Sequence, residues 1–88
     1  MKIVAKPVKT IVVFERDGSF PVPYKFKIED EEGSVVAVKV KYIHSTYKSR
    51  IAGVESIFYE CQSVICGAEK RYELKYIPAR NQWQLYKI

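Results

Sequence analysis

The stretch Arg71-Tyr72-Glu73-Leu74-Lys75-Tyr76 alternates strictly between charged side chains and large apolar or aromatic ones. A period of two residues places the apolar side chains on one face of a β-strand and the charged ones on the other. The stretch therefore predicts a strand that is buried on one face and solvated on the other. The same pattern recurs along most of the chain, so it decides the fold class.

Five further segments carry the signals of β-strands. Aromatic and β-branched residues predominate in them, as is typical of strands. Their expected ranges are 9–15, 24–29, 35–42, 56–66 and 83–88. Turn signals separate most of them: Asp17-Gly18, the acidic run 29–33, and the segments 66–69 and 78–81. Residues 44–53 lose the alternation, and we expect a polar loop there.

The alternation also predicts which side chains point into the core. In three of the strands the apolar positions share one parity, and these positions are expected to be buried. They are Tyr24, Phe26 and Ile28; Val36, Val38, Val40 and Tyr42; and Ile57, Tyr59 and Cys61. Val35 and Ala37 extend the apolar character to the opposite face, so the start of that strand is expected to be covered on both sides.

These six strands, joined by short connections, predict an all-β domain with antiparallel pairing that spans residues 1–88. Each strand has one apolar face to hide, and no helix is expected to cover it. A small closed or partly open β-barrel hides these faces and also removes exposed strand edges. A two-layer β-sandwich is the alternative architecture.

Composition limits the compartment and the partners. The chain is 48% hydrophobic and 28% charged, which is ordinary for a globular protein. Its net charge of +5 is compatible with nucleic acid or another anionic partner. No apolar run approaches the roughly 18 residues of a membrane span, and Lys6-Pro7 interrupts the first one. We therefore expect a cytoplasmic protein with no membrane partner.

Few residues are suited to catalysis or to metal binding. Cys61, His44 and Ser45 are the available nucleophile and base residues, and a cysteine nucleophile needs an adjacent base to activate it. Two cysteines and one histidine do not complete a zinc site, and the carboxylates of the acidic run 29–32 are expected to splay apart. We expect no enzymatic activity, no metal, no cofactor and no small-molecule substrate.

The segment 39–50 is the main candidate for a binding surface. It is rich in basic and aromatic residues and contains no acid. Basic groups neutralise phosphates and aromatic rings stack on unpaired bases, which is how small β-barrels bind single strands. The candidate binding residues are Lys39, Lys41, Tyr47, Lys48 and Arg50. The interpretation requires that they share one exposed face; the alternative is an ordinary solvated strand face.

The number of aromatic residues indicates a second kind of binding. More large apolar side chains are present than one small core accommodates, so some are expected on the surface. The candidates are Phe14, Phe20, Phe58, Tyr86 and Ile88. The favoured hypothesis is therefore a non-catalytic binding or assembly module that contacts a protein partner or a second copy of itself. Single-stranded nucleic-acid binding through segment 39–50 is the alternative.

Most of the chain resembles a group of small bacterial proteins. The residues that carry the resemblance are Gly53, Phe58-Tyr59-Glu60-Cys61-Gln62-Ser63, Tyr72-Glu73-Leu74-Lys75-Tyr76 and Trp83-Gln84-Leu85-Tyr86-Lys87. The similar proteins are bacterial β proteins of about this length without an assigned function. The resemblance implies a compact β protein from a bacterial cytoplasm, and it transfers no activity, ligand or catalytic residue.

Overall fold

The structure is a computed structural model that describes residues 1–29 and 31–88. It contains eight strands and one 3-10 turn, and no α-helix occurs in the described residues. The strands are β1 (Ile3–Pro7), β2 (Lys9–Val13), β3 (Val22–Glu29), β4 (Val35–Lys39), β5 (Tyr42–Ile51), β6 (Val54–Ile65), β7 (Ala68–Ile77) and β8 (Gln82–Lys87), with the turn η1 (Pro78–Arg80) before β8. No helix in the described part of the chain is long and apolar enough to cross a membrane.

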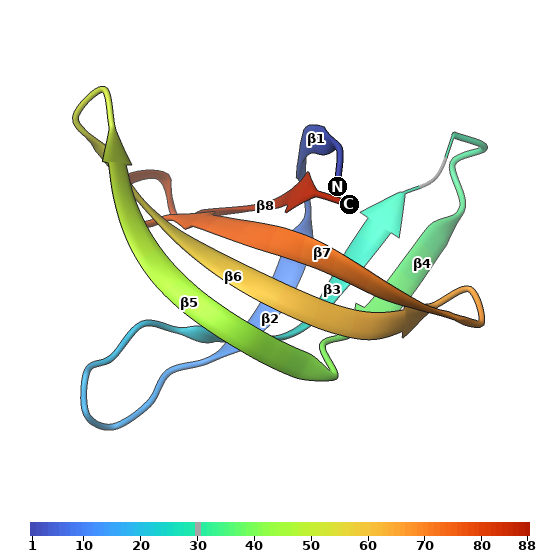
Figure 1. Ribbon diagram of the computed structural model, residues 1–88, viewed down its shortest axis with the longest axis horizontal. Helices are drawn as coiled ribbons and strands as arrows, with labels where there is room; N and C mark the ends of the chain where they lie inside the picture. The colour runs from blue at the N-terminus through green and yellow to red at the C-terminus, as the bar shows by residue number, and fades with distance from the viewer. Residues whose placement is uncertain (30) are drawn as a thin grey trace.

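The strands form two antiparallel sheets (Figure 1). The larger sheet has the order β1-β8-β7-β6-β5, and the smaller one has the order β2-β3-β4. This confirms the prediction of an all-β antiparallel fold. The number of strands differs from the six expected, because Ile3–Pro7 forms a strand and because the segment 35–51 contains two.

The chain passes from one sheet to the other at two corners. Val8 separates β1 from β2, and its amide donates a hydrogen bond to the Trp83 carbonyl over 3.0 Å. Residues 40–41 separate β4 from β5, and the Lys41 amide donates to the Gln62 carbonyl over 3.2 Å. Strands that bend from one layer into the other make the corners of two-layer β structures. The described residues therefore form two layers joined at corners, and no closed barrel is present among them.

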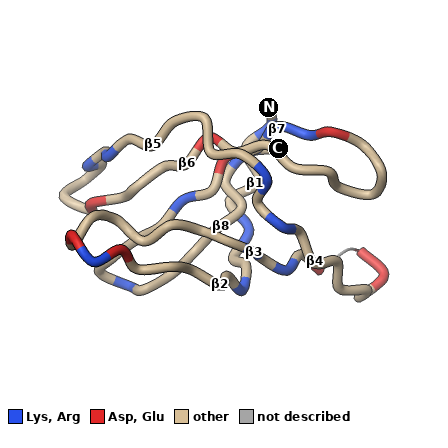
Figure 2. Tube along the Cα trace, turned by 90° about the horizontal axis from the view of Figure 1, so that it is seen from below, with Lys and Arg blue, Asp and Glu red and all other residues tan. Residues whose placement is uncertain are grey.

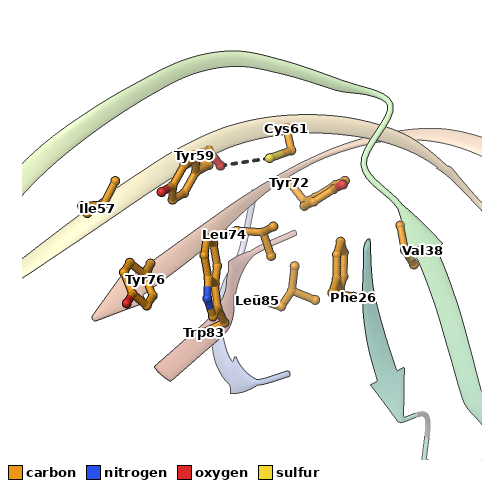
Figure 3. Close-up of a cluster of buried hydrophobic side chains, with 10 residues drawn as sticks. All are labelled: Phe26, Val38, Ile57, Tyr59, Cys61, Tyr72, Leu74, Tyr76, Trp83 and Leu85. Carbon is orange, nitrogen blue, oxygen red and sulfur yellow. Dashed lines mark hydrogen bonds between the residues drawn. The ribbon is translucent and has the colours of Figure 1, made fainter. Parts of the chain in front are cut away.

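The core lies between the two sheets (Figure 3). The larger sheet supplies most of it, and Phe26 and Val38 supply the contribution of the smaller sheet. The rings of Phe26 and Tyr72 join the layers, with their centroids 5.3 Å apart. The other members of the cluster are Ile57, Tyr59, Cys61, Leu74, Tyr76, Trp83 and Leu85. The predicted inward positions on the strands around residues 57–61 and 72–76 are thus confirmed.

Two polar groups in the core bond to each other. The hydroxyls of Ser63 and Tyr72 lie 2.6 Å apart, and both side chains are buried. A buried hydroxyl without a partner destabilises a fold, so this pair removes that penalty at both residues. Burial also raises the pKa of the Tyr72 phenol, because the charged form is poorly solvated there.

Residues 42–51 form the strand β5, which includes most of the segment 44–53 where the sequence predicted a polar loop. β5 pairs with β6 along its length, and the register shifts between Ile43 and Ser45. This bulge breaks the alternation on which the prediction depended. The hairpin between the strands turns at Ala52-Gly53, where both residues have a positive φ (52° and 78°). Two such residues favour the turn whose twist matches that of the flanking strands.

Several predicted inward positions are in fact exposed. Tyr42 is 51% exposed. The corner at residues 40–41 interrupts the strand that contains Val36, so the alternation of inward and outward side chains does not continue to Tyr42. Val35 and Ala37 are exposed on the outer side of β4, so the start of this strand is covered on one face only.

Candidate functional site

Four lysines gather on the outer face of the three-stranded sheet. Lys9 lies opposite Lys27 on β2 and β3, and Lys25 lies opposite Lys39 on β3 and β4. Residues directly opposite each other on antiparallel strands point to the same face. Since Phe26, between Lys25 and Lys27, is buried in the core, these lysines point away from it. We call Lys9, Lys25, Lys27 and Lys39 the lysine face.

The lysines of this face form no ion pair in the described residues, although Glu29 at the end of β3 has the same parity as Lys25 and Lys27. The ion pairs found among residues 1–29 and 31–88 involve Lys41, Lys48 and Arg50, and none involves the lysine face. In Figure 2, blue segments run along β2, β3 and β4, and the red segments of the connecting turns lie toward the ends of this sheet. Like charges opposite each other destabilise a sheet, by roughly 1 kcal/mol at close approach in water. The face therefore favours an anionic ligand.

An exposed aromatic ring borders the lysine face. Tyr24 is 48% exposed, although its parity with Phe26 predicted burial. The cause is a shift in the β2–β3 register: Ile11 pairs with Lys25 but the next residue pairs with Pro23, which leaves Tyr24 as the extra residue of a bulge. The Lys39 Nζ lies 5.6 Å from the centre of the Tyr24 ring. A ring held in this position is available for stacking beside the positive charges.

Two of the predicted binding residues lie at or near the lysine face. Lys39 belongs to it. Lys41 lies at the corner between the sheets, and its Nζ is 2.7 Å from Glu69 Oε1. The hydrogen bond to this carboxylate, together with its negative charge, raises the pKa of Lys41. Lys41 is thus already partnered. Of these two predicted residues, only Lys39 belongs to the lysine face, and it forms no ion pair within the described residues.

The other three predicted residues lie on β5, in the other sheet. Lys48 and Arg50 both reach Glu55, at 3.5 and 3.6 Å. Tyr47 lies opposite Phe58 on the outer face, whereas Lys48 lies opposite the core residue Ile57. The five predicted residues therefore do not share one exposed face. The segment 39–50 is not a single binding surface, because a corner and the alternation of β5 distribute its side chains over different faces.

A group of aromatic residues covers the outer face of the five-stranded sheet. Phe58 is only 4% exposed although no second layer covers it. The Tyr47 ring stacks on it at 5.1 Å, the Tyr86 ring meets it edge-on at 5.2 Å, and the Lys75 Nζ lies 5.5 Å from its centre. The Tyr47 hydroxyl donates to Glu73 Oε1 over 3.2 Å. These side chains cover one another, so they leave less ring surface for a ligand than Tyr24 does.

The residues considered for catalysis are separated by the larger sheet. Cys61 is buried in the core, and its thiol donates to the Tyr59 carbonyl. His44 lies on exposed surface and bonds to Gln62 Oε1 over 2.8 Å. Burial raises the pKa of Cys61 to about 12, which disfavours the reactive thiolate. His44 therefore does not activate Cys61 in this fold.

No cluster of metal ligands is formed by the described residues. Glu29 of the acidic run is the last residue of β3, Glu31 and Glu32 lie in the connection to β4, and Asp30 is outside the described residues. Cys61 is buried and Cys66 is exposed in the next turn, and neither forms a disulfide. The described residues thus form no assembled group that holds a cation.

The sequence indicated part of the lysine face but not the whole. The alternation between 24 and 29 already placed Lys25 and Lys27 on an outward face. Lys9 joins them only because β2 pairs with β3 in one particular register, and Lys39 joins from the other side. The turn signal Asp17-Gly18 indicates a hairpin between the strands that carry Lys9 and Lys27. The connection between these strands is long, so the sequence does not determine which residues pair across the hairpin.

Comparison with known proteins identifies no relative of this chain. No family model matches the chain, and no curated protein or solved structure is significantly similar to it. The resemblance to small bacterial proteins accordingly stays an expectation.

Proposed function

We propose that this protein is a non-catalytic binding module that holds single-stranded nucleic acid on the lysine face. The observation that carries the proposal is the cross-strand pairing of Lys9 with Lys27 and of Lys25 with Lys39, which places the four lysines on one sheet face. Phosphates placed among these ammonium groups relieve their mutual repulsion and release condensed counterions. Both effects favour binding, and both weaken as salt is added.

The shape of the face favours a single strand over a duplex. Three strands spaced by about 4.8 Å make a face only about 10 Å wide, which suits one backbone. An α-helix is one element that fits the major groove of a duplex, and the described residues contain none. Tyr24 adds an exposed ring, and stacking on such a ring is available only to unpaired bases.

The test is a titration of fluorescent oligonucleotides at several salt concentrations. A single strand of about 12 nucleotides covers a typical site. Contact with four phosphates predicts a slope of log affinity against log salt of about −3. Changing one lysine of the face, as in Lys27→Gln, is expected to reduce the magnitude of the slope by about 0.7. The matched control is Lys70→Gln on β7, which removes the same charge from the other sheet.

Three results of this titration contradict the proposal. Absence of binding at low salt is the first. Binding of duplex as tight as that of single strands is the second, since the stacking argument requires open bases. Binding to vesicles containing anionic lipid in the absence of any nucleic-acid binding is the third, because it assigns the lysine face to a membrane surface.

The second candidate is self-association through β5, and one observation favours it. β5 is the edge of the five-stranded sheet and has ten residues, among which Tyr42, Tyr47 and Ile51 are exposed. An edge strand presents unpaired backbone groups, which a second copy of the same strand satisfies in an antiparallel arrangement. The two cations Lys48 and Arg50 oppose such pairing, as charges on edge strands commonly do. Sedimentation at increasing protein concentration tests this candidate, and a monomer at all concentrations contradicts it.

A further inference from the structure

A groove opens beside the lysine face, where the two sheets diverge. It lies between β2 and the turn that joins β7 to β8, and its volume is about 620 Å³. Its walls include Thr10 from β2, Tyr76 from β7, Asn81 from the turn and Trp83 from β8. This volume lies within the range of small-ligand sites, roughly 300–1,000 Å³.

Thr10, which lines this groove, carries an unusual polar atom. Its hydroxyl oxygen is buried and forms no hydrogen bond, and it is the only such side-chain atom among residues 1–29 and 31–88. Buried polar groups in folded proteins are almost always bonded, so an unbonded one calls for an explanation. Thr10 lies opposite Phe26 and faces inward. A valine at this position has the same shape as threonine and avoids the cost of burying a hydroxyl without a hydrogen bond. A ligand that bonds to the hydroxyl supplies the reason for a threonine at this position.

Aromatic and amide groups complete the groove. The rings of Tyr76 and Trp83 are stacked, with their centroids 4.7 Å apart. The Tyr76 hydroxyl donates to Asn81 Oδ1 over 3.2 Å, and the Asn81 side chain is exposed, so its amide is open to solvent. Asn81 is held there by a left-handed backbone conformation at the end of η1. The unbonded hydroxyl and the exposed amide, beside two largely buried rings, match a ligand with polar edges.

Lys9 connects this groove to the lysine face. It lines the groove and lies opposite Lys27 on the sheet. We infer that the groove receives one nucleobase of the strand whose phosphates lie on the lysine face, with Thr10 and Asn81 bonding to the edge of the base. The inference rests on the proposed function and adds a base-binding subsite to it.

The experiment compares a single-stranded oligonucleotide with an abasic strand of the same length. Trp83 is the only tryptophan of the chain, so its fluorescence reports on the groove. The oligonucleotide is expected to change this fluorescence, and the abasic strand is expected to bind with a similar salt slope and no such change. Thr10→Val is expected to weaken binding of the oligonucleotide by about 2- to 10-fold, the range for one hydrogen bond, and to leave the abasic strand unaffected.

Thr10→Ser keeps the hydroxyl and is the matched control, with binding expected to remain close to that of the wild type. Urea unfolding of each variant verifies that both are folded. If both strands bind equally well, Trp83 does not respond and Thr10→Val has no effect, the base subsite is wrong while the lysine-face proposal stands. If neither strand binds, both proposals fail.

Discussion

Lys25 lies directly opposite Lys39 on paired strands, and both side chains leave the same face of the three-stranded sheet. No carboxylate among the described residues forms an ion pair with either of them. Stability alone favours opposite charges at such a position. The lysine pair therefore lowers the stability of this sheet and, at the same time, supplies positive charge for the proposed binding. A substitution at one of the two lysines measures both effects.

Reversal of one charge is expected to affect stability and binding in opposite directions. Lys25→Glu places a carboxylate opposite Lys39, which is expected to stabilise the fold by about 0.2–1 kcal/mol in urea unfolding. The same change removes two units of positive charge from the lysine face, so the magnitude of the salt slope for a single strand is expected to fall by about 1.4. Lys70→Glu, with the same change in net charge on the other sheet, is expected to leave the slope unchanged. Equal slopes for the two variants contradict the assignment of the site.

The two cysteines are expected to react with a thiol reagent at very different rates. Cys66 is exposed and Cys61 is buried, with a pKa raised to about 12 by desolvation. Only the thiolate reacts, so at pH 8 one thiol is expected to be modified quickly and the second only as the protein unfolds. Cys66→Ser is expected to abolish the fast phase. A fast phase that persists in this variant means that Cys61 is accessible.

Stability is expected to fall as the solution becomes alkaline. The folded-state pKa of Cys61 lies above its ordinary value of 9.0, and burial also raises the pKa values of Tyr59 and Tyr72 above 10.0. The folded state then binds more protons than the unfolded state, so the free energy of unfolding decreases above about pH 9. The limiting slope is about 1.4 kcal/mol per pH unit for each group. Urea unfolding between pH 7 and pH 11 measures it, and Cys61→Ala is expected to remove the part that begins near pH 9.

Phe58 is expected to contribute to stability although it lies on an outer face. It is 4% exposed beneath Tyr47, Tyr86 and Lys75. Phe58→Ala is therefore expected to destabilise the fold by about 2–4 kcal/mol, close to the cost of the same change at a core phenylalanine. Phe14 is 71% exposed, and Phe14→Ala is expected to change stability by less than about 0.5 kcal/mol. Thermal or urea unfolding compares the two. Similar effects for both would falsify the view that the outer aromatic group is packed.

The prediction of individual strands succeeded where the alternation was regular and failed where a bulge or a corner interrupted it. Tyr72, Leu74 and Tyr76 are buried as expected, because β7 keeps one parity along this stretch. Tyr24 and Tyr42 are exposed against expectation, the first through the β2–β3 bulge and the second through the corner after β4. The β1 strand was missed because all its residues are exposed and its register is irregular.

The sequence by itself determined the fold class and most of the core, because the burial of alternate side chains is a local property with a period of two residues. It did not determine which strands meet. The lysine face combines residues from three strands, and the groove combines Thr10 with Trp83 from the opposite end of the chain. Strand order, register and the positions of bulges arise from pairing between distant segments, which local periodicity does not encode. Only the tertiary structure therefore decided where the positive charges gather and which groove lies beside them.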